Sequence, residues 1–128
     1  MADEHDVERI ALSLPETSRR EGEFRFFVCD KAFAWSYMER VDPKRPRVRR
    51  SDVLAVRVDG EERKDALLAT APGTYFITDH YLGYPAILVR LPVIGTGELE
   101  ELLTDAWRCR APRRLVKAFD AASGSGMD

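Results

Sequence analysis

Residues 72–85, PGTYFITDHYLGYP, are followed directly by the apolar run AILVRL at 86–91, and these two segments decide the fold. Pro72-Gly73 is a turn signal, and residues 74–78 are rich in the β-branched and aromatic side chains that favour a strand. We therefore predict two consecutive strands at 74–78 and 86–91. The polar, aromatic loop between them, which contains His80, is either tightly packed or a recognition surface.

Hydrophobic periodicity predicts the rest of the fold. Apolar residues at helical spacing indicate helices that begin near Asp3, Asp59 and Thr96 and a last helix over 112–121. Strands are expected at 24–29, 32–38 and 52–58, with a tight turn at Asp30-Lys31 and irregular segments at 15–23 and 39–50. The order α-β-β-β-α-β-β-α-α predicts an α+β domain over 1–121, with one mostly antiparallel five-stranded sheet and helices packed on one side. Residues 122–128 are expected to be a flexible tail.

The same periodicity predicts the core. Phe33, Trp35 and Tyr37 stand at alternate positions, which places them on one face of a strand. Exposed aromatic residues could stack on nucleic-acid bases, but the alternation favours a buried face of the sheet. The expected core residues are Val7, Ile10, Leu14, Phe26, Phe33, Trp35, Leu54, Val56, Leu67, Ile77, Val89, Leu102, Ala106 and Phe119.

The bulk composition is that of an ordinary globular domain. The chain has 128 residues, 45% of them hydrophobic, and a formal net charge of −2, so it lacks the overall basic field common among nucleic-acid-binding proteins. Cys29 and Cys109 fit no metal or redox motif and are expected to be buried free thiols. The first twenty residues lack the pattern of an export signal, and no run suits a membrane span. We therefore expect a cytoplasmic protein without a metal ion or cofactor.

The segments PGTYFITDHYLGYP, LVRL, ELLTDAWR and APRRLV, in this order and spacing, resemble the MmcQ/YjbR family of small bacterial proteins, and KAFAW and VRVDGEERKDALL fit it too. The resemblance covers roughly residues 5–120. It implies a fold like that of type III secretion chaperones and a DNA-binding function. Where family members often carry Thr-Pro-His-Tyr, this chain has Thr78-Asp79-His80-Tyr81, which replaces a rigid proline with a negative charge.

The basic residues are concentrated in two runs. Residues 40–50 hold six of them beside one acid, and residues 108–117 hold five with no acid, so the two runs contain 11 of the chain's 20. Such segregation suits phosphate binding, although a solvated loop and a helix end would give the same pattern. The predicted nucleic-acid-binding residues are Arg45, Arg47, Arg49, Arg50, Arg108, Arg113, Arg114 and Lys117.

The loop residues His80, Tyr81 and Tyr84 are a second candidate site. His80 could hold the loop by a hydrogen bond, contact a ligand, or act as an acid or base. Catalysis would need a nucleophile, a second carboxylate or a metal, and no motif supplies one, so we expect no enzymatic activity.

Two functions remain open. The first is nucleic-acid binding, to DNA as the resemblance implies, through arginine contacts to phosphates. The alternative is a protein-interaction domain like the secretion chaperones, as monomer or homodimer. Convergence of residues 40–50 and 108–117 on one face would favour the first, whereas separate runs and an apolar exposed sheet face would favour the second.

Overall fold

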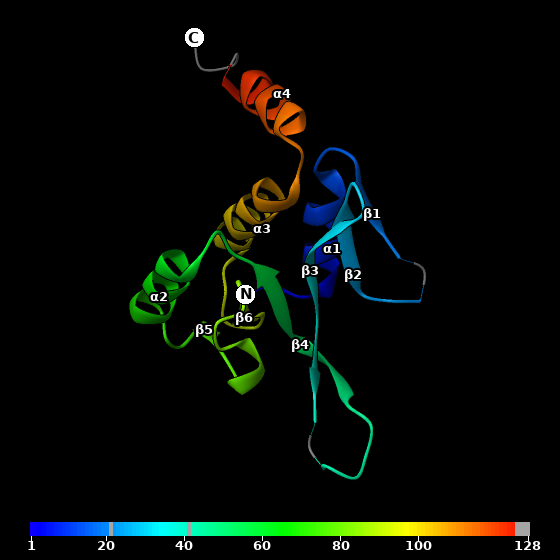
Figure 1. Cartoon of the computed structure of the whole chain (residues 1–128), viewed down its shortest axis with the longest axis vertical. Coiled ribbons are helices and arrows are strands. Elements are labelled where there is room, and N and C mark those ends of the chain that lie inside the picture. The colour runs from blue at the N-terminus through cyan, green and yellow to red at the C-terminus, as the bar shows by residue number, and fades with distance from the viewer. Residues whose placement is uncertain (21, 41, 125–128) are drawn as a thin grey trace.

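The computed structural model describes residues 1–20, 22–40 and 42–124, and these form an α+β fold with one antiparallel sheet (Figure 1). The described residues contain six strands, in the spatial order β1-β2-β3-β4-β6-β5, and four α-helices. Along the chain these are α1 (Glu4–Ser13), β1 (Thr17–Arg19), β2 (Arg25–Val28), β3 (Lys31–Glu39), β4 (Val48–Arg57), α2 (Glu61–Thr70), β5 (Tyr75–Phe76), the 3₁₀ turn η1 (Asp79–Tyr81), β6 (Ala86–Arg90), α3 (Thr96–Arg110) and α4 (Arg113–Gly124).

The predicted α+β class is confirmed, but the prediction of five strands is wrong. β1 lies in the segment 15–23 that was expected to be irregular, and it pairs antiparallel with β2, with Thr17 opposite Val28. A three-residue, mostly exposed edge strand is too short and too polar to show an alternating pattern. The element order is therefore α-β-β-β-β-α-β-β-α-α.

The turn between β2 and β3 lies one residue earlier than predicted. Val28 pairs with Lys31, so the two turn residues are Cys29 and Asp30, and their φ values are +47° and +68°. Positive φ at both positions is the type I′ geometry that matches the twist of a two-residue hairpin. The prediction of a buried Cys29 is wrong for the same reason, because the turn exposes it, whereas Cys109 is half-buried.

This turn gives a testable prediction. Asn-Gly is the preferred pair for a type I′ turn because both residues tolerate positive φ. The double change Cys29→Asn with Asp30→Gly should raise the free energy of unfolding by about 1 kcal/mol. Urea denaturation measures this, with Cys29→Val as the opposite control, because a β-branched residue is strained at this φ. A double variant no more stable than the parent would contradict the turn assignment.

A β-bulge in β3 corrects the predicted alternation of Phe33, Trp35 and Tyr37. Phe26 pairs with Ala34 while Phe27 pairs with Ala32, so Phe33 is an extra residue in β3. Phe33 consequently faces the helices with Phe26, whereas Trp35 packs with a second cluster on the opposite face of the sheet.

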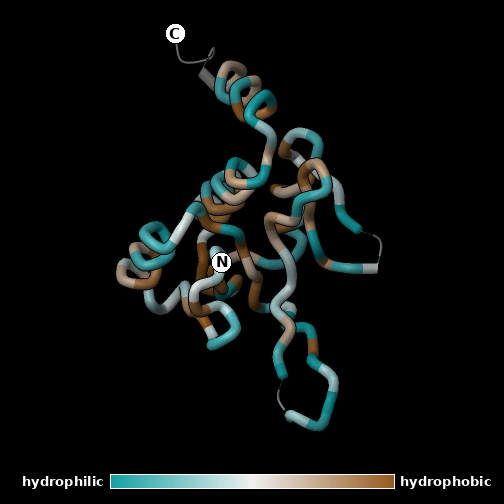
Figure 2. Tube along the Cα trace, viewed as in Figure 1, coloured by the Kyte–Doolittle hydropathy of each residue, from teal (hydrophilic) through white to brown (hydrophobic). Residues whose placement is uncertain are grey.

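The main core lies between the helices and one face of the sheet. Buried residues of α1, α3 and α4 pack there against β2, β3, β4 and β6, and Figure 2 shows hydrophobic residues gathered in this central region. The predicted core residues that are buried in it are Val7, Ile10, Leu14, Phe26, Phe33, Leu54, Val56, Val89, Leu102 and Ala106. Leu67, Ile77 and Phe119 are partly buried against it, and Trp35 lies outside it.

Two predicted irregular segments are partly regular. β3 and β4 extend into residues 39–50, so the connection between them covers 40–47. The last helix continues to Gly124, past the predicted start of the tail at residue 122, and residues 125–128 of that tail lie outside the described residues.

Candidate functional site

Five aromatic side chains cover the sheet face opposite the main core. Trp35 and Tyr37 lie on β3, Phe76 on β5, and Tyr81 and Tyr84 in the loop that leads to β6; we call this set the aromatic face. Its rings touch edge to face or tilted, with centroids 6.1–6.5 Å apart. An edge-to-face contact covers only one face of one of its two rings, so the set can still offer stacking surfaces to a ligand.

The loop that carries Tyr81 and Tyr84 is held by a buried lysine. Lys64, on α2, is only 1% exposed, and its Nζ donates hydrogen bonds to the backbone carbonyls of Tyr81 and Tyr84, the latter at 2.7 Å. The role of holding the loop, considered for His80 from the sequence, is thus carried by Lys64. His80 is instead exposed, with its Nε2 2.9 Å from Nη2 of Arg47.

Tyr81 is fixed from a second direction. Its hydroxyl accepts a hydrogen bond from Nε1 of Trp35 at 3.3 Å. Burial raises the pKa of the Tyr81 phenol, and the hydrogen bond from Trp35 offsets part of that rise. Near neutral pH the phenol therefore keeps its proton, and its oxygen accepts the hydrogen bond from Trp35.

A cavity of about 460 Å³ opens on the aromatic face, and we call it the central cavity. It is within the usual size range of small-ligand sites. None of the described residues that line it is acidic: they are Arg25, Ala32, Trp35, Ser36, Tyr37, Met38, Arg47, Arg57, His80, Tyr81, Tyr84 and Arg110.

Four arginines converge on the central cavity without acidic partners. The guanidinium of Arg25 lies 5.8 Å from the ring centroid of Trp35, and that of Arg57 lies 5.7 Å from that of Tyr84, distances typical of cation–π pairs. Arg47 contacts His80, and Arg110 has a buried Nε with no hydrogen-bond partner in the described part of the chain. None of the four forms an ion pair with a described carboxylate, so their positive charge is available to an anion.

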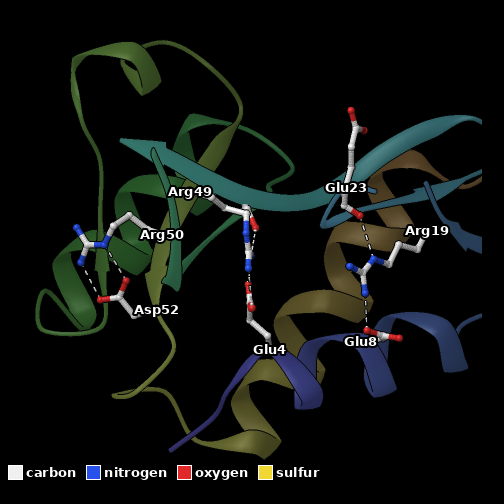
Figure 3. A network of polar contacts seen from close by, with 8 residues as sticks. Glu4, Glu8, Arg19, Glu23, Arg49, Arg50 and Asp52 are labelled. Atoms are coloured by element: carbon white, nitrogen blue, oxygen red, sulfur yellow. Dashed lines mark hydrogen bonds and ion pairs between the residues drawn. The ribbon is translucent and has the colours of Figure 1, made fainter. Parts of the chain in front are cut away.

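Most of the cations predicted from the sequence are neutralised by the protein itself. Arg49 pairs with Glu4 and Arg50 with Asp52 (Figure 3), and Arg50 also pairs with Glu39. These contacts raise the pKa of Arg49 and Arg50 and lower that of Asp52. The other predicted cations with an acidic partner are Arg45 with Asp42, Arg108 with Asp120 and Arg114 with Glu16.

The tip of the β3–β4 hairpin, in the first basic run, and α4, in the second, lie at opposite ends of the molecule (Figure 1), but Arg47 of the first run and Arg110 of the second line the same cavity. Arg113 and Lys117 are exposed on α4. Of the eight predicted cations only Arg47 lines the central cavity, together with all three predicted loop residues, His80, Tyr81 and Tyr84.

Sequence reasoning missed Arg25, Arg57 and Lys64, and it counted Arg110 in the basic run 108–117 without selecting it as a binding residue. Arg25 and Arg57 stand at strand positions next to apolar residues, and a charge in such a place is the signal that could have identified them. Nothing in the pattern of α2 distinguishes Lys64 from its charged neighbours. Within the described ranges, no three His, Cys, Asp or Glu side chains are grouped so that they could hold a metal ion.

Comparisons with known proteins identify the family of the chain. The sequence model of the YjbR family matches residues 12–109. The chain is 42% identical, over 97% of its length and 100% of theirs, to uncharacterized proteins of Mycobacterium bovis and of two strains of Mycobacterium tuberculosis. No solved structure matches the chain. In the described residues no helix combines the length and the apolar character needed to cross a bilayer. A match over most of the chain, together with the motifs at 72–91 and 99–116, means that this protein belongs to the YjbR family, also called MmcQ/YjbR.

Proposed function

We propose that this protein binds nucleic acid through the central cavity and the aromatic face around it. The observation that carries the proposal is the convergence of Arg25, Arg47, Arg57 and Arg110 on a cavity that no described acidic residue lines. Guanidinium groups bind phosphate oxygens in a bidentate manner, and aromatic rings stack on bases. A ligand that offers both groups matches the site better than an inorganic anion or an apolar peptide.

The charge distribution supports this location over the two basic runs. An arginine that already pairs with a carboxylate must give up that pair to bind phosphate, so Arg49 and Arg50 offer less net attraction than their number suggests. The unpaired arginines of the central cavity carry no such cost. We therefore assign the phosphate contacts to the cavity. Arg47 belongs both to the first basic run and to the lining of the cavity.

The alternative function, protein interaction, draws support from the distance between the hairpin tip and α4 (Figure 1), but Arg47 and Arg110, one from each run, share the central cavity. This alternative function would also require an apolar exposed sheet face. The aromatic face is instead crossed by arginines, with Arg25 over Trp35, Arg57 over Tyr84 and Arg90 over Phe76. This mixture favours an anionic aromatic ligand.

A binding assay with paired variants tests the proposal. Fluorescence anisotropy with labelled DNA and RNA of about 16 nucleotides, single-stranded and duplex, should detect binding at ~50 mM salt. Changing Arg25 and Arg57 to Gln should weaken the affinity about 10-fold or more, and should reduce the magnitude of the salt slope by about 1.5, the value for two lost phosphate contacts.

The matched control is Arg113→Gln with Arg114→Gln, which removes the same charge from α4. It should change the affinity by no more than about 2-fold, because neither residue lines the cavity and Arg114 already pairs with Glu16. If both double changes weakened nucleic-acid binding equally, the binding site would include the basic runs and not the cavity alone. No binding of any nucleic acid by micromolar protein would overturn the function and favour a protein partner.

A further inference from the structure

We infer that the occupant of the central cavity is single-stranded nucleic acid, with bases stacked on the aromatic face, and that a duplex binds more weakly. This inference rests on the proposed function and goes beyond it. Three observations carry it: the position of unpaired cations over aromatic rings, the neighbouring cavities that share lining residues with the central one, and the exposure of aromatic rings inside them.

Two of the unpaired cations lie over aromatic rings. A duplex presents its phosphates on the outside of a wide rod and keeps the faces of its bases stacked on one another. Its bases therefore cannot stack on the aromatic rings of the protein. Arg49 and Arg50 are paired with carboxylates. The unpaired Arg25 and Arg57 instead lie over Trp35 and Tyr84, where an unstacked nucleotide can meet cation and ring together.

Two neighbouring cavities share lining residues with the central cavity. A cavity of about 520 Å³ shares Arg25 and Trp35 with it, and another of about 330 Å³ shares Tyr37. The second contains Arg90, whose guanidinium lies 4.1 Å from the ring centroid of Phe76. A free nucleotide would fill only one of these spaces, whereas a strand several nucleotides long can occupy all three.

The two neighbouring cavities are also lined by acidic residues, but each of these residues is paired with an arginine. Glu39 and Asp52, in the cavity with Arg90, pair with Arg50, and Glu23, in the other cavity, pairs with Arg20. The positive potential is therefore strongest in the central cavity. We place the principal phosphate contacts there and additional base contacts in the two neighbouring cavities.

Trp35 provides a direct readout. The chain has two tryptophans, and Trp107 is fully buried in the core, so a ligand that quenches tryptophan fluorescence reports on Trp35. Titrations should compare oligo(dT) of about 16 nucleotides, the matching duplex, an abasic strand of the same length and free dTMP, at one salt concentration. We expect the single strand to quench the fluorescence and to bind about 10-fold or more tightly than the other three.

Two variants locate the contact. Tyr84→Ala should weaken single-strand binding about 10-fold, because the 43%-exposed ring of Tyr84 offers a stacking surface. Leu82→Ala is the matched control: Leu82 is 66% exposed in the same loop and does not line the cavity, so its removal should leave the affinity unchanged.

Each outcome decides one question. Duplex binding as tight as single-strand binding, or an abasic strand as tight as oligo(dT), would overturn the inference and leave nucleic-acid binding intact. If free dTMP bound as tightly as the strand, the inference would be wrong and the occupant of the cavity would be a mononucleotide. Failure of all four ligands, with the protein folded by circular dichroism, would overturn the proposed function itself.

Discussion

Trp107→Ala should lower the free energy of unfolding by about 3–5 kcal/mol, the largest effect on stability that we expect from a single change. Trp107 is the largest fully buried side chain in the described residues, and its ring packs against Phe119 of α4 with centroids 5.0 Å apart. Its Nε1 also donates a hydrogen bond of 3.0 Å to the carbonyl of Pro15. The side chain therefore ties α3 to α4 and to the segment after α1.

Urea denaturation measures this loss, and two comparisons separate its causes. Trp107→Phe keeps most of the apolar volume but removes the donor to Pro15, so it should cost only about 1–2 kcal/mol. Trp35→Ala should cost less than Trp107→Ala, because Trp35 is only partly buried, on the opposite face of the sheet. A total stability of about 5–15 kcal/mol is usual for such domains, so Trp107→Ala should be close to unfolding at 37 °C. An unchanged urea midpoint would contradict the packing of α3 described above.

Lys64→Met should have the second-largest effect, on both stability and binding. The change keeps an apolar stem in the buried position but removes the donor to the carbonyls of Tyr81 and Tyr84. We expect a loss of about 2–3 kcal/mol of unfolding free energy. The loop that carries His80, Tyr81 and Tyr84 should also lose order, so nucleic-acid affinity should fall even though Lys64 does not line the cavity.

Hydrogen exchange gives the sharpest test of this role. In Lys64→Met, amides of residues 79–85 should exchange faster relative to those of β4, because the hydrogen bonds of Nζ of Lys64 go to the carbonyls of Tyr81 and Tyr84. The control is Arg63→Met, which removes the same charge one residue earlier and breaks only a surface pair with Asp105 at 3.5 Å. It should cost less than about 1 kcal/mol. Unchanged protection of residues 79–85 in Lys64→Met would show that the loop is held by other contacts.

Local pattern was sufficient where an element is long and buried on one side. The helical spacing of Val7, Ile10 and Leu14 and the strand pattern around Leu54 and Val56 gave the α+β class and most of the core. It failed at β1, which is short and polar, and at Trp35, where the extra residue Phe33 in β3 reverses the alternation. A bulge of this kind depends on how two strands fit together, so no single-strand pattern reveals it.

For the candidate site, too, some features could be predicted from local sequence and others could not. His80, Tyr81 and Tyr84 could be predicted because a histidine and two tyrosines in a loop stand out by residue type. The basic runs could be seen too, but not their neutralisation, since Glu4 pairs with Arg49 across 45 positions of sequence and Glu16 pairs with Arg114 across 98. The free charge of an arginine depends on what lies beside it in space.

The sequence by itself therefore determined the fold class, the family, most of the core and the loop that borders the site. Those properties follow from residue types and from the periods of helix and strand, which are local. Only the tertiary structure decided which arginines are free, that Arg25, Arg57 and Arg110 join Arg47 in one cavity, and that Lys64 holds the loop. These properties arise because the sheet and the end of α3 bring distant residues within a few ångströms of one another, and the strength of an electrostatic or hydrogen-bond contact depends on that separation and not on the distance along the chain.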